Sequence, residues 1–312
     1  MEKSNIDEKI KLLTGSGMWH TQEVKGLPSV HLSDGPHGLR KQEEKERQNN
    51  VSLVSTCYPT ASALACSWDV TAAERLGRAV AKEAWNADVA VLLGPGINMK
   101  RSPLCGRNFE YFSEDPFLAG RLGAAYVSAA QGENVAVSLK HFAANNQETN
   151  RQTSNSQIDE RALREIYLSA FEYVVKTARP ATVMASYNRL NGYYACENHH
   201  LLTEILREEW GFDGVVISDW GACADLAKAV KAGMDLEMPD SHGIHARKLK
   251  AALKAGEISE EDIAKAAGRI EKLVKKYAPD NRAKKDTSYA HEIAKQLSLI
   301  HISEPTRRSY IS

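Results

Sequence analysis

The sequence predicts an α/β protein built as a (β/α)8, TIM-barrel-like domain with an irregular first repeat. From about residue 70 onward, short apolar segments alternate with amphipathic helical segments, a pattern typical of a parallel sheet covered by helices. The strand segments are continuously apolar, as expected for strands that are buried on both faces. Roughly 250 residues of this pattern favour a closed barrel, and no strand precedes the glycine-rich motif of a nucleotide-binding open sheet.

The repeat units follow one another in order along the chain. We expect helices over residues 71–85, 116–131, 159–178, 201–210, 223–233, 245–256 and 259–277. We expect strands over residues 89–94, 135–142, 181–188, 214–218 and 234–239.

Three helical segments show their features most clearly. The segment 71–85 places one apolar face at Ala73, Leu76, Val80 and Ala84. The segment 159–178 is expected to do the same with Leu163, Ile166, Ala170 and Val174. The last helix begins at a predicted capping box formed by Ser259 and Asp262.

The composition is that of an ordinary globular protein. Of the 312 residues, 43% are hydrophobic and 26% are charged, and the formal net charge is zero. Neither nucleic acid nor a membrane surface is therefore expected as a partner. The sequence shows no membrane-spanning run and no secretory signal, and its five cysteines have no CxxC spacing. We expect a cytoplasmic protein with no disulfide framework, no metal and no cofactor.

The chain divides into three regions. Residues 1–278 are the expected barrel domain, and residues 279–296 are expected to begin a linker. Residues 297–312 have neither helical nor strand periodicity and resemble the translation of a sequencing adapter. We expect this last segment to be a non-native tail, so it is left out of the fold prediction.

Polar side chains follow several of the expected strands. Lys140 and His141 end one strand, Tyr187 follows another, and Asp219 and Trp220 follow a third. Because the carboxyl ends of barrel strands build one rim, these side chains are expected to share a pocket. Their mixture suits a sugar, since carboxylates and cations hydrogen-bond hydroxyl groups and an aromatic face packs on the ring.

Each of these residues has a structural alternative. Asp34 stands in a Gly/Pro turn and is a common turn former there. Arg107 can pair with Glu110 or Glu114 within its own loop, and Trp220 can be plain packing. A strand-end lysine such as Lys140 can also form a Schiff base.

Five motifs, in order, carry a resemblance to a known family. They are SDGPHGLR (33–40), GPGINMKRSPLCGRNFEYFSEDP (94–116), KHFAANNQETNR (140–151), ASYNRLNG (185–192) and GVVISDWGA (214–222). At these spacings the chain resembles the N-terminal barrel of glycoside hydrolase family 3, most of all the bacterial β-glucosidases. The resemblance covers about residues 5–296.

The resemblance implies a retaining hydrolase that releases sugars from the non-reducing end of β-glucosides or oligosaccharides. It implies that Asp219 is the nucleophile, which forms a covalent glycosyl-enzyme. The cations near it are expected to keep its pKa low. The substrate-binding residues implied by the motifs are Asp34, Arg40, Arg107, Lys140, His141, Arg151, Tyr187 and Trp220.

The second carboxyl group of a retaining enzyme is not evident in the sequence. In the β-glucosidase branch, the resemblance places this acid/base glutamate in a second α/β domain, on which the barrel packs. The single-domain branch carries a histidine after its KHF motif, which KHFAANNQETNR lacks. We therefore expect an incomplete chain that is inactive or weak alone, with Glu114 and Glu148 as the nearest substitutes.

Two other classes of function stay open at this point. One is a Schiff-base lyase that uses Lys140, and the other is a barrel that binds sugar without catalysis. The sugar itself also stays open, since glucose is favoured by the motifs but xylose and galactose are not excluded.

Overall fold

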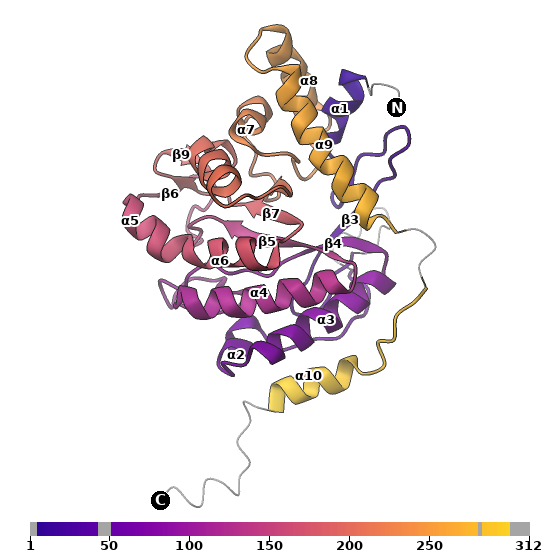
Figure 1. The fold of residues 1–312 in the computed structure, drawn as a ribbon, viewed down its shortest axis with the longest axis vertical. Helices are drawn as coiled ribbons and strands as arrows, with labels where there is room; N and C mark the ends of the chain where they lie inside the picture. The colour runs from indigo at the N-terminus through magenta and orange to yellow at the C-terminus, as the bar shows by residue number, and fades with distance from the viewer. Residues whose placement is uncertain (1–4, 43–50, 280–282, 300–312) are drawn as a thin grey trace, which may run out of the picture.

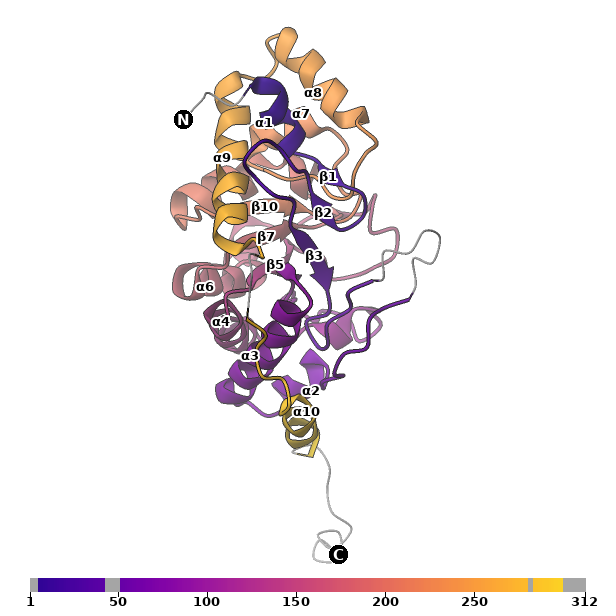
Figure 2. The same ribbon diagram turned by 90° about the vertical axis from the view of Figure 1, so that its right-hand side faces the viewer.

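The computed structural model describes residues 5–42, 51–279 and 283–299, and seven of its strands form a curled, mixed sheet with helices outside it (Figures 1 and 2). The order of its strands is β1 (Gly15–Ser16), β2 (His20–Thr21), β3 (His31–Asp34), β4 (Val89–Leu93), β5 (Ala136–Phe142), β7 (Thr182–Ala185) and β10 (Val215–Ser218). A separate small sheet contains β6 (Asn155–Ser156), β8 (Arg189–Leu190) and β9 (Tyr193–Tyr194).

The curled sheet closes through the segment around Leu236 and Glu237. Leu236 bridges in parallel to Ile217 of β10, and Glu237 bridges in parallel to Thr14, next to β1. The strands from β3 to β10 pair in parallel, whereas β1, β2 and β3 pair antiparallel. The predicted barrel-like α/β fold is thus confirmed, and its irregular part is the antiparallel start.

Helices surround the barrel. The α-helices are α1 (Ile6–Leu12), α2 (Ala61–Ala65), α3 (Val70–Asn86), α4 (Pro116–Gly132), α5 (Glu160–Ala162), α6 (Ser169–Ala178), α7 (Leu226–Ala232), α8 (Ile244–Lys254), α9 (Glu260–Tyr277) and α10 (Ala290–Leu299). Short 3₁₀ turns are η1 (Asn108–Glu110) and η3 (Ala195–Glu197), and π-helical segments are η2 (Leu163–Tyr167) and η4 (His200–Glu209).

Local sequence signals explain where several helices begin. Asp69, Asp115 and Asp225 stand at the N-caps of α3, α4 and α7, and each side chain accepts a hydrogen bond from backbone N–H groups of the first turn. The capping box predicted at Ser259 and Asp262 is present at the start of α9. No helix in the described ranges is both long and apolar enough to cross a membrane.

One predicted helical register is wrong. The segment 159–178 is not a continuous α-helix, because α5 runs into the π-helical η2 before α6 begins. The N–H of Leu168 donates to the carbonyl oxygen of Leu163, five residues back, at 2.8 Å. This wide turn shifts the register, so Ile166 is exposed while Leu163, Ala170 and Val174 are buried as expected.

The last described helix extends beyond the expected break at residue 297. Helix α10 ends at Leu299, and Ala290, Ala294 and Leu297 form its buried face. These positions share one side of a helix, and α10 lies beside α3, far from α9 (Figure 1). The rest of the predicted tail, 300–312, lies outside the described residues.

A buried carboxylate holds the closing segment to the helical layer. Asp235 is fully buried, and its Oδ2 accepts hydrogen bonds from the backbone N–H of Val216 and from Arg207, both at 2.7 Å. Its Oδ1 accepts from Arg269 at 2.8 Å. The single side chain therefore joins β10, η4 and α9.

Replacing this carboxylate should destabilise the barrel strongly. We expect Asp235→Asn to lower the free energy of unfolding by about 3 kcal/mol or more, because two arginines lose their anion in a buried place. Urea denaturation measures this loss. The matched control is Glu165→Gln, which breaks an exposed ion pair with Arg161 and should cost at most about 0.5 kcal/mol. A cost below about 1 kcal/mol for Asp235→Asn would contradict this role.

Candidate active site

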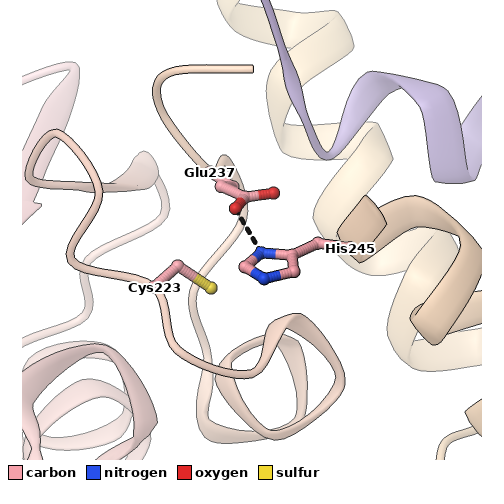
Figure 3. Close-up of side chains that lie close together, drawn as sticks. All are labelled: Cys223, Glu237 and His245. Carbon is pink, nitrogen blue, oxygen red and sulfur yellow. Dashed lines mark hydrogen bonds and ion pairs between the residues drawn. The ribbon is translucent and has the colours of Figure 1, made fainter. Parts of the chain in front are cut away.

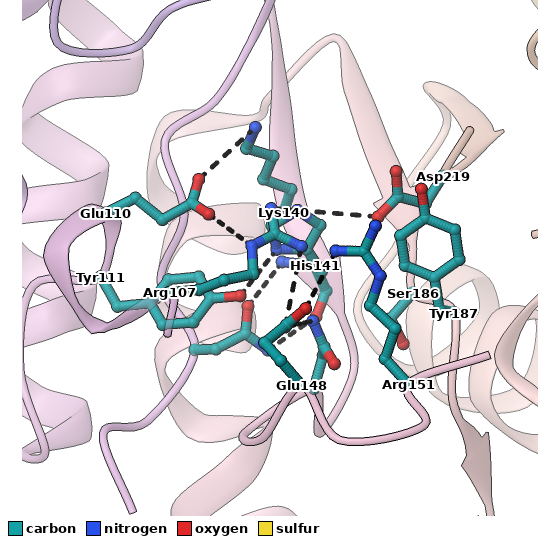
Figure 4. A network of polar contacts seen from close by, with 12 residues as sticks. Arg107, Glu110, Tyr111, Lys140, His141, Glu148, Arg151, Ser186, Tyr187 and Asp219 are labelled. Atoms are coloured by element: carbon teal, nitrogen blue, oxygen red, sulfur yellow. Dashed lines mark hydrogen bonds and ion pairs between the residues drawn. The ribbon is translucent and has the colours of Figure 1, made fainter. Parts of the chain in front are cut away.

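The candidate site lies at the carboxyl ends of the parallel strands. Asp34 is the last residue of β3, and Lys140 and His141 lie near the end of β5. Tyr187 and Asp219 follow β7 and β10, and the loop after β4 supplies Arg107. Figure 4 shows Arg107, Lys140, His141, Tyr187 and Asp219 meeting in one polar network, and Asp34 joins it through its contact with Lys140.

His141 stands at the centre of this network. Its Nε2 lies 2.6 Å from Arg107 Nη2, and its Nδ1 lies 3.0 Å from the hydroxyl oxygen of Tyr111. Burial, with Arg107 and Lys140 nearby, holds the pKa of His141 well below its ordinary value, so the ring is neutral. Because a guanidinium only donates, Nε2 is the acceptor and the ring proton sits on Nδ1.

Two carboxylates hold Lys140 in place. Lys140 is 4% exposed, and its Nζ lies 3.6 Å from Asp34 Oδ1 and 3.7 Å from Glu110 Oε2. Glu110 also accepts a hydrogen bond from Nε of Arg107 at 2.5 Å. Burial opposes ionisation of Glu110, but Lys140 and Arg107 outweigh it and lower the pKa of this carboxyl.

The loop after β5 adds a third cation to Lys140 and Arg107. Arg151 Nη1 donates to Glu148 Oε2 at 2.9 Å, and its guanidinium carbon lies 4.4 Å from the centre of the Tyr187 ring. Glu148 Oε1 accepts from the side-chain amide of Asn145 at 3.1 Å and lies 3.9 Å from Arg107 Nη1. Arg151 is therefore stacked on Tyr187 rather than free in solvent.

Asp219 presents one oxygen with no hydrogen-bond partner. Its Oδ1 accepts from the backbone N–H of Trp220 at 2.7 Å. Its Oδ2 is buried and lacks such a partner in the described part of the chain. His141 Nε2 lies 3.8 Å from this Oδ2, which is too far for a hydrogen bond, and it already accepts from Arg107.

An aromatic wall lies beside Asp219. The indole N–H of Trp220 donates to the carbonyl oxygen of Met18 at 2.8 Å, and its ring centre lies 5.2 Å from that of Trp19. The hydroxyl of Tyr187 donates to the carbonyl oxygen of Trp220 at 2.9 Å. These contacts fix the loop that carries Asp219 and give it an apolar surface suited to a sugar ring.

The expected direction of the Asp219 pKa is wrong. Burial of the carboxyl raises its pKa above the ordinary value, although Arg107, the Trp220 N–H and Lys140 act in the opposite direction. The nearby cations alone would lower this pKa, but the cost of removing the carboxylate from water exceeds their attraction.

The network brings together eight of the predicted site residues and leaves the side chain of Arg40 apart. The backbone N–H of Arg40 donates to the carbonyl oxygen of Asp34 at 2.9 Å, but its side chain is exposed. Glu114, a predicted substitute acid, is also exposed, whereas Glu148 lies in the network. Sequence reasoning underrated Glu110 and missed Tyr111, whose roles depend on contacts with Lys140 and His141 across the rim.

The family follows from a match over most of the chain. Residues 36–273 match the model of the glycosyl hydrolase family 3 N-terminal domain. The chain belongs to glycoside hydrolase family 3. Thermostable beta-glucosidase B of Acetivibrio thermocellus is 48% identical over 302 residues, which is 95% of this chain and 40% of that protein. An exo-alpha-(1->6)-L-arabinopyranosidase of Bifidobacterium longum is 51% identical over 242 residues, which is 76% of this chain and 32% of that protein.

Solved structures of family 3 members have the same fold. The Bifidobacterium adolescentis beta-glucosidase is 43% identical with a TM-score of 0.89, and the match covers 95% of this chain and 43% of that one. Beta-glucosidase 3B of Thermotoga neapolitana, solved with glucose, is 38% identical with a TM-score of 0.87, covering 95% and 45%. This family 3 chain thus spans less than half the length of these relatives.

The raised pKa of Asp219 predicts a pH-dependent gain in stability from its amide variant. A carboxyl whose folded pKa is raised binds more protons in the folded state, so stability falls as pH rises from the ordinary pKa of 3.8 through the raised value. Asp219→Asn removes this loss, and we expect it to stabilise the protein by about 0.5–2 kcal/mol at pH 7. The gain should vanish below the ordinary pKa.

Denaturant unfolding of both proteins across pH measures this difference. The matched control is Asp88→Asn, since Asp88 is exposed in a left-handed turn that asparagine also tolerates. If Asp219→Asn is neutral or destabilising at pH 7, the burial of Asp219 does not oppose its ionisation.

Proposed function

We propose that this chain forms the sugar-binding and nucleophilic part of a retaining, exo-acting β-glycoside hydrolase of the β-glucosidase type. The observation that carries the proposal is the Oδ2 of Asp219, which has no hydrogen-bond partner among the described residues. It lies at a rim with several cations (Figure 4), beside the indole rings of Trp220 and Trp19. The β-glucosidases among the relatives support the reaction class.

The rim offers matched partners for the hydroxyl groups of a sugar. Lys140 and the half-exposed Asp34 provide a donor and an acceptor 3.6 Å apart, as needed for neighbouring hydroxyls. Arg151 lies on the opposite side of the rim against Tyr187 and adds further donors. The rings of Trp220 and Trp19 supply the apolar surface.

Asp219 then acts as the nucleophile. Its Oδ2 forms a bond to the anomeric carbon while the bond from that carbon to the leaving oxygen breaks, giving a covalent glycosyl-enzyme. Water later attacks the same carbon and gives its proton to the second carboxyl group, now a carboxylate, while the bond from that carbon to Asp219 breaks and releases Asp219 as a carboxylate. Arg107 and Lys140 stabilise the ionised form that the attack requires, and they offset part of the penalty of burial.

The leaving oxygen needs a proton from a second carboxyl group. A general acid must keep its proton near neutral pH, which calls for a raised pKa. Glu110 does not fit, because Lys140 and Arg107 lower its pKa. Glu148 is engaged by Arg151 and Asn145. We therefore propose that the acid comes from outside the described residues, as part of the length that the relatives have in excess.

The sugar is proposed only as a class. Relatives named beta-glucosidase and exo-alpha-(1->6)-L-arabinopyranosidase are about equally similar to this chain. Glucose is our first choice. The feature that we propose the rim recognises is a pyranose ring whose glycosidic bond is equatorial. The Schiff-base alternative is disfavoured, because two carboxylates hold the Lys140 ammonium group, whereas a nucleophilic lysine needs a neutral amine.

A mechanism-based label tests the nucleophile. We expect a 2-deoxy-2-fluoro-β-glucoside with a dinitrophenolate leaving group to label Asp219, because this leaving group needs no proton. Peptide mass spectrometry locates the label, and Asp219→Asn should remain unlabelled. A label on another residue, or borohydride trapping of a carbonyl compound on Lys140, would contradict the proposed mechanism. Sugar affinity without any label would favour a binding barrel.

A pair of aryl glucosides tests for the missing acid. The chain alone should hydrolyse a phenyl glucoside at least about 10²-fold more slowly than a dinitrophenyl glucoside, because the loss of general acid catalysis affects only the poor leaving group. Initial rates on both substrates measure the ratio. Equal and rapid rates would show that an acid/base residue already exists in this chain.

A further inference from the structure

A second cluster of chemically reactive side chains lies behind the loop that carries Asp219. Cys223 lies on the loop after β10, Glu237 on the closing segment of the barrel, and His245 near the start of α8. Figure 3 shows their side chains pointing toward one another. A sulfur, a carboxylate oxygen and a ring nitrogen from these three residues all lie within 4.8 Å of each other.

Burial and backbone contacts hold this cluster in place. Cys223 is 6% exposed and Glu237 is 4% exposed, and the His245 side chain is only 17% exposed. The N–H of Glu237 donates to the carbonyl oxygen of Leu13, and its own carbonyl oxygen accepts from the N–H of Gly15, both at 2.9 Å. The three ligand atoms thus come from separate segments that the closed barrel fixes relative to one another.

The donor set matches the preferences of zinc. Zinc binds cysteine sulfur, histidine nitrogen and carboxylate oxygen at roughly 2.0–2.3 Å, in tetrahedral geometry. Ligand atoms in such a site lie roughly 3.3–3.6 Å apart. The Cys223 sulfur would therefore move closer to the other two ligand atoms, which now lie within 4.8 Å of it. A calcium or magnesium ion would not select a thiol.

We propose that Cys223, Glu237 and His245 form a binding site for a thiophilic divalent cation, with Zn²⁺ as the first choice. A water molecule completes the coordination, since the three residues supply three ligands. This site goes beyond the proposed hydrolase activity, and no metal site was expected from the sequence. The spacing of 14 and 8 residues between the ligands has no motif that would reveal them before folding.

The existing contact between His245 and Glu237 has to give way when the cation binds. His245 Nδ1 forms a short ion-pair contact with Glu237, and Ser241 donates a hydrogen bond to the other carboxylate oxygen at 3.3 Å. The cation replaces the first contact, while the Ser241 bond still orients the carboxylate. Zinc needs a nitrogen-to-oxygen separation of roughly 3.3 Å, so the His245 ring and the Glu237 carboxylate must move apart to accept the cation.

The bound cation would link the loop that carries Asp219 to the closing segment of the barrel. The loop residue Gly221 already donates to the carbonyl oxygen of Met238 at 2.8 Å, beside Glu237. A link through Cys223 adds a second attachment, four residues after Asp219. Zinc binding is therefore expected to raise the melting temperature, as any ligand of the folded state does.

The experiment uses the full chain in a Cys57→Ser/Cys66→Ser background, because these two cysteines are exposed free thiols. Metal-free protein is titrated with Zn²⁺ against a chromophoric chelator, and Co²⁺ is added separately to record a thiolate-to-cobalt band. We expect about one equivalent of Zn²⁺ at submicromolar affinity and a near-ultraviolet cobalt band.

Cys223→Ser and His245→Gln should each weaken zinc binding by about 100-fold, and Cys223→Ser should abolish the cobalt band. The matched control is His200→Gln. His200 makes the same kind of contact, from Nδ1 to Glu204 at 2.6 Å, but on the exposed surface. It should leave zinc affinity unchanged within about twofold.

Three results would overturn the site. One is the absence of a thiolate-to-cobalt band in the parent protein, which decides the question even if Cys223→Ser fails to fold. The second is retention of zinc affinity in His245→Gln, which would show that His245 is not a ligand. The third is an equal loss in His200→Gln, which would place the metal on the surface.

Discussion

The structure depends on burying charge without leaving it unpaired, and Asp235 is the clearest case. Its carboxylate is fully buried, and it accepts hydrogen bonds from two arginines and a backbone N–H. The closing segment joins β10 on one side and β1 on the other, so its position decides whether the barrel is closed. The rim residues follow strands that this closure joins into a barrel.

At the active-site rim, the buried charges are only partly paired. Lys140, Arg107 and Glu110 compensate one another, as buried ion pairs must. Asp219 keeps one oxygen without a hydrogen bond, and its ionised form is disfavoured by burial. Such incomplete satisfaction is typical of functional sites, where reactivity is gained at the expense of stability.

Much of the fold was predictable, because the spacing of apolar residues follows from which face of a helix or strand is buried. Four of the five expected strands and most helices lie where apolar spacing placed them, whereas residues 234–239 form only isolated bridges. Aspartates or Ser259 mark several helix starts. The antiparallel start was not located, because β1 and β2 are two residues long and carry no period. The register around Ile166 failed because a single wide turn changes the spacing without changing composition.

The site was predictable in its members but not in its electrostatics. Strand-end positions indicated Lys140, His141, Tyr187 and Asp219, since parallel strands bring their carboxyl ends together. The tautomer of His141 and the direction of the Asp219 pKa depend on three-dimensional burial, which no local pattern encodes. The pairing of Glu110 with Lys140 likewise joins residues from different loops.

In the closing segment, side chains two residues apart point to the same face of the barrel, and this affects the order of folding. Asp235 and Glu237 are two residues apart, and both face the helical layer, toward Arg207 and Arg269 in one case and His245 in the other. Before η4 and α9 arrive, pairing this segment with β10 would bury the Asp235 carboxylate without its two arginines, at a cost of several kcal/mol. Glu237 would likewise lack its contact with the ring of His245 until α8 arrives. We therefore expect the barrel to close late in folding, after its outer helices have packed in place.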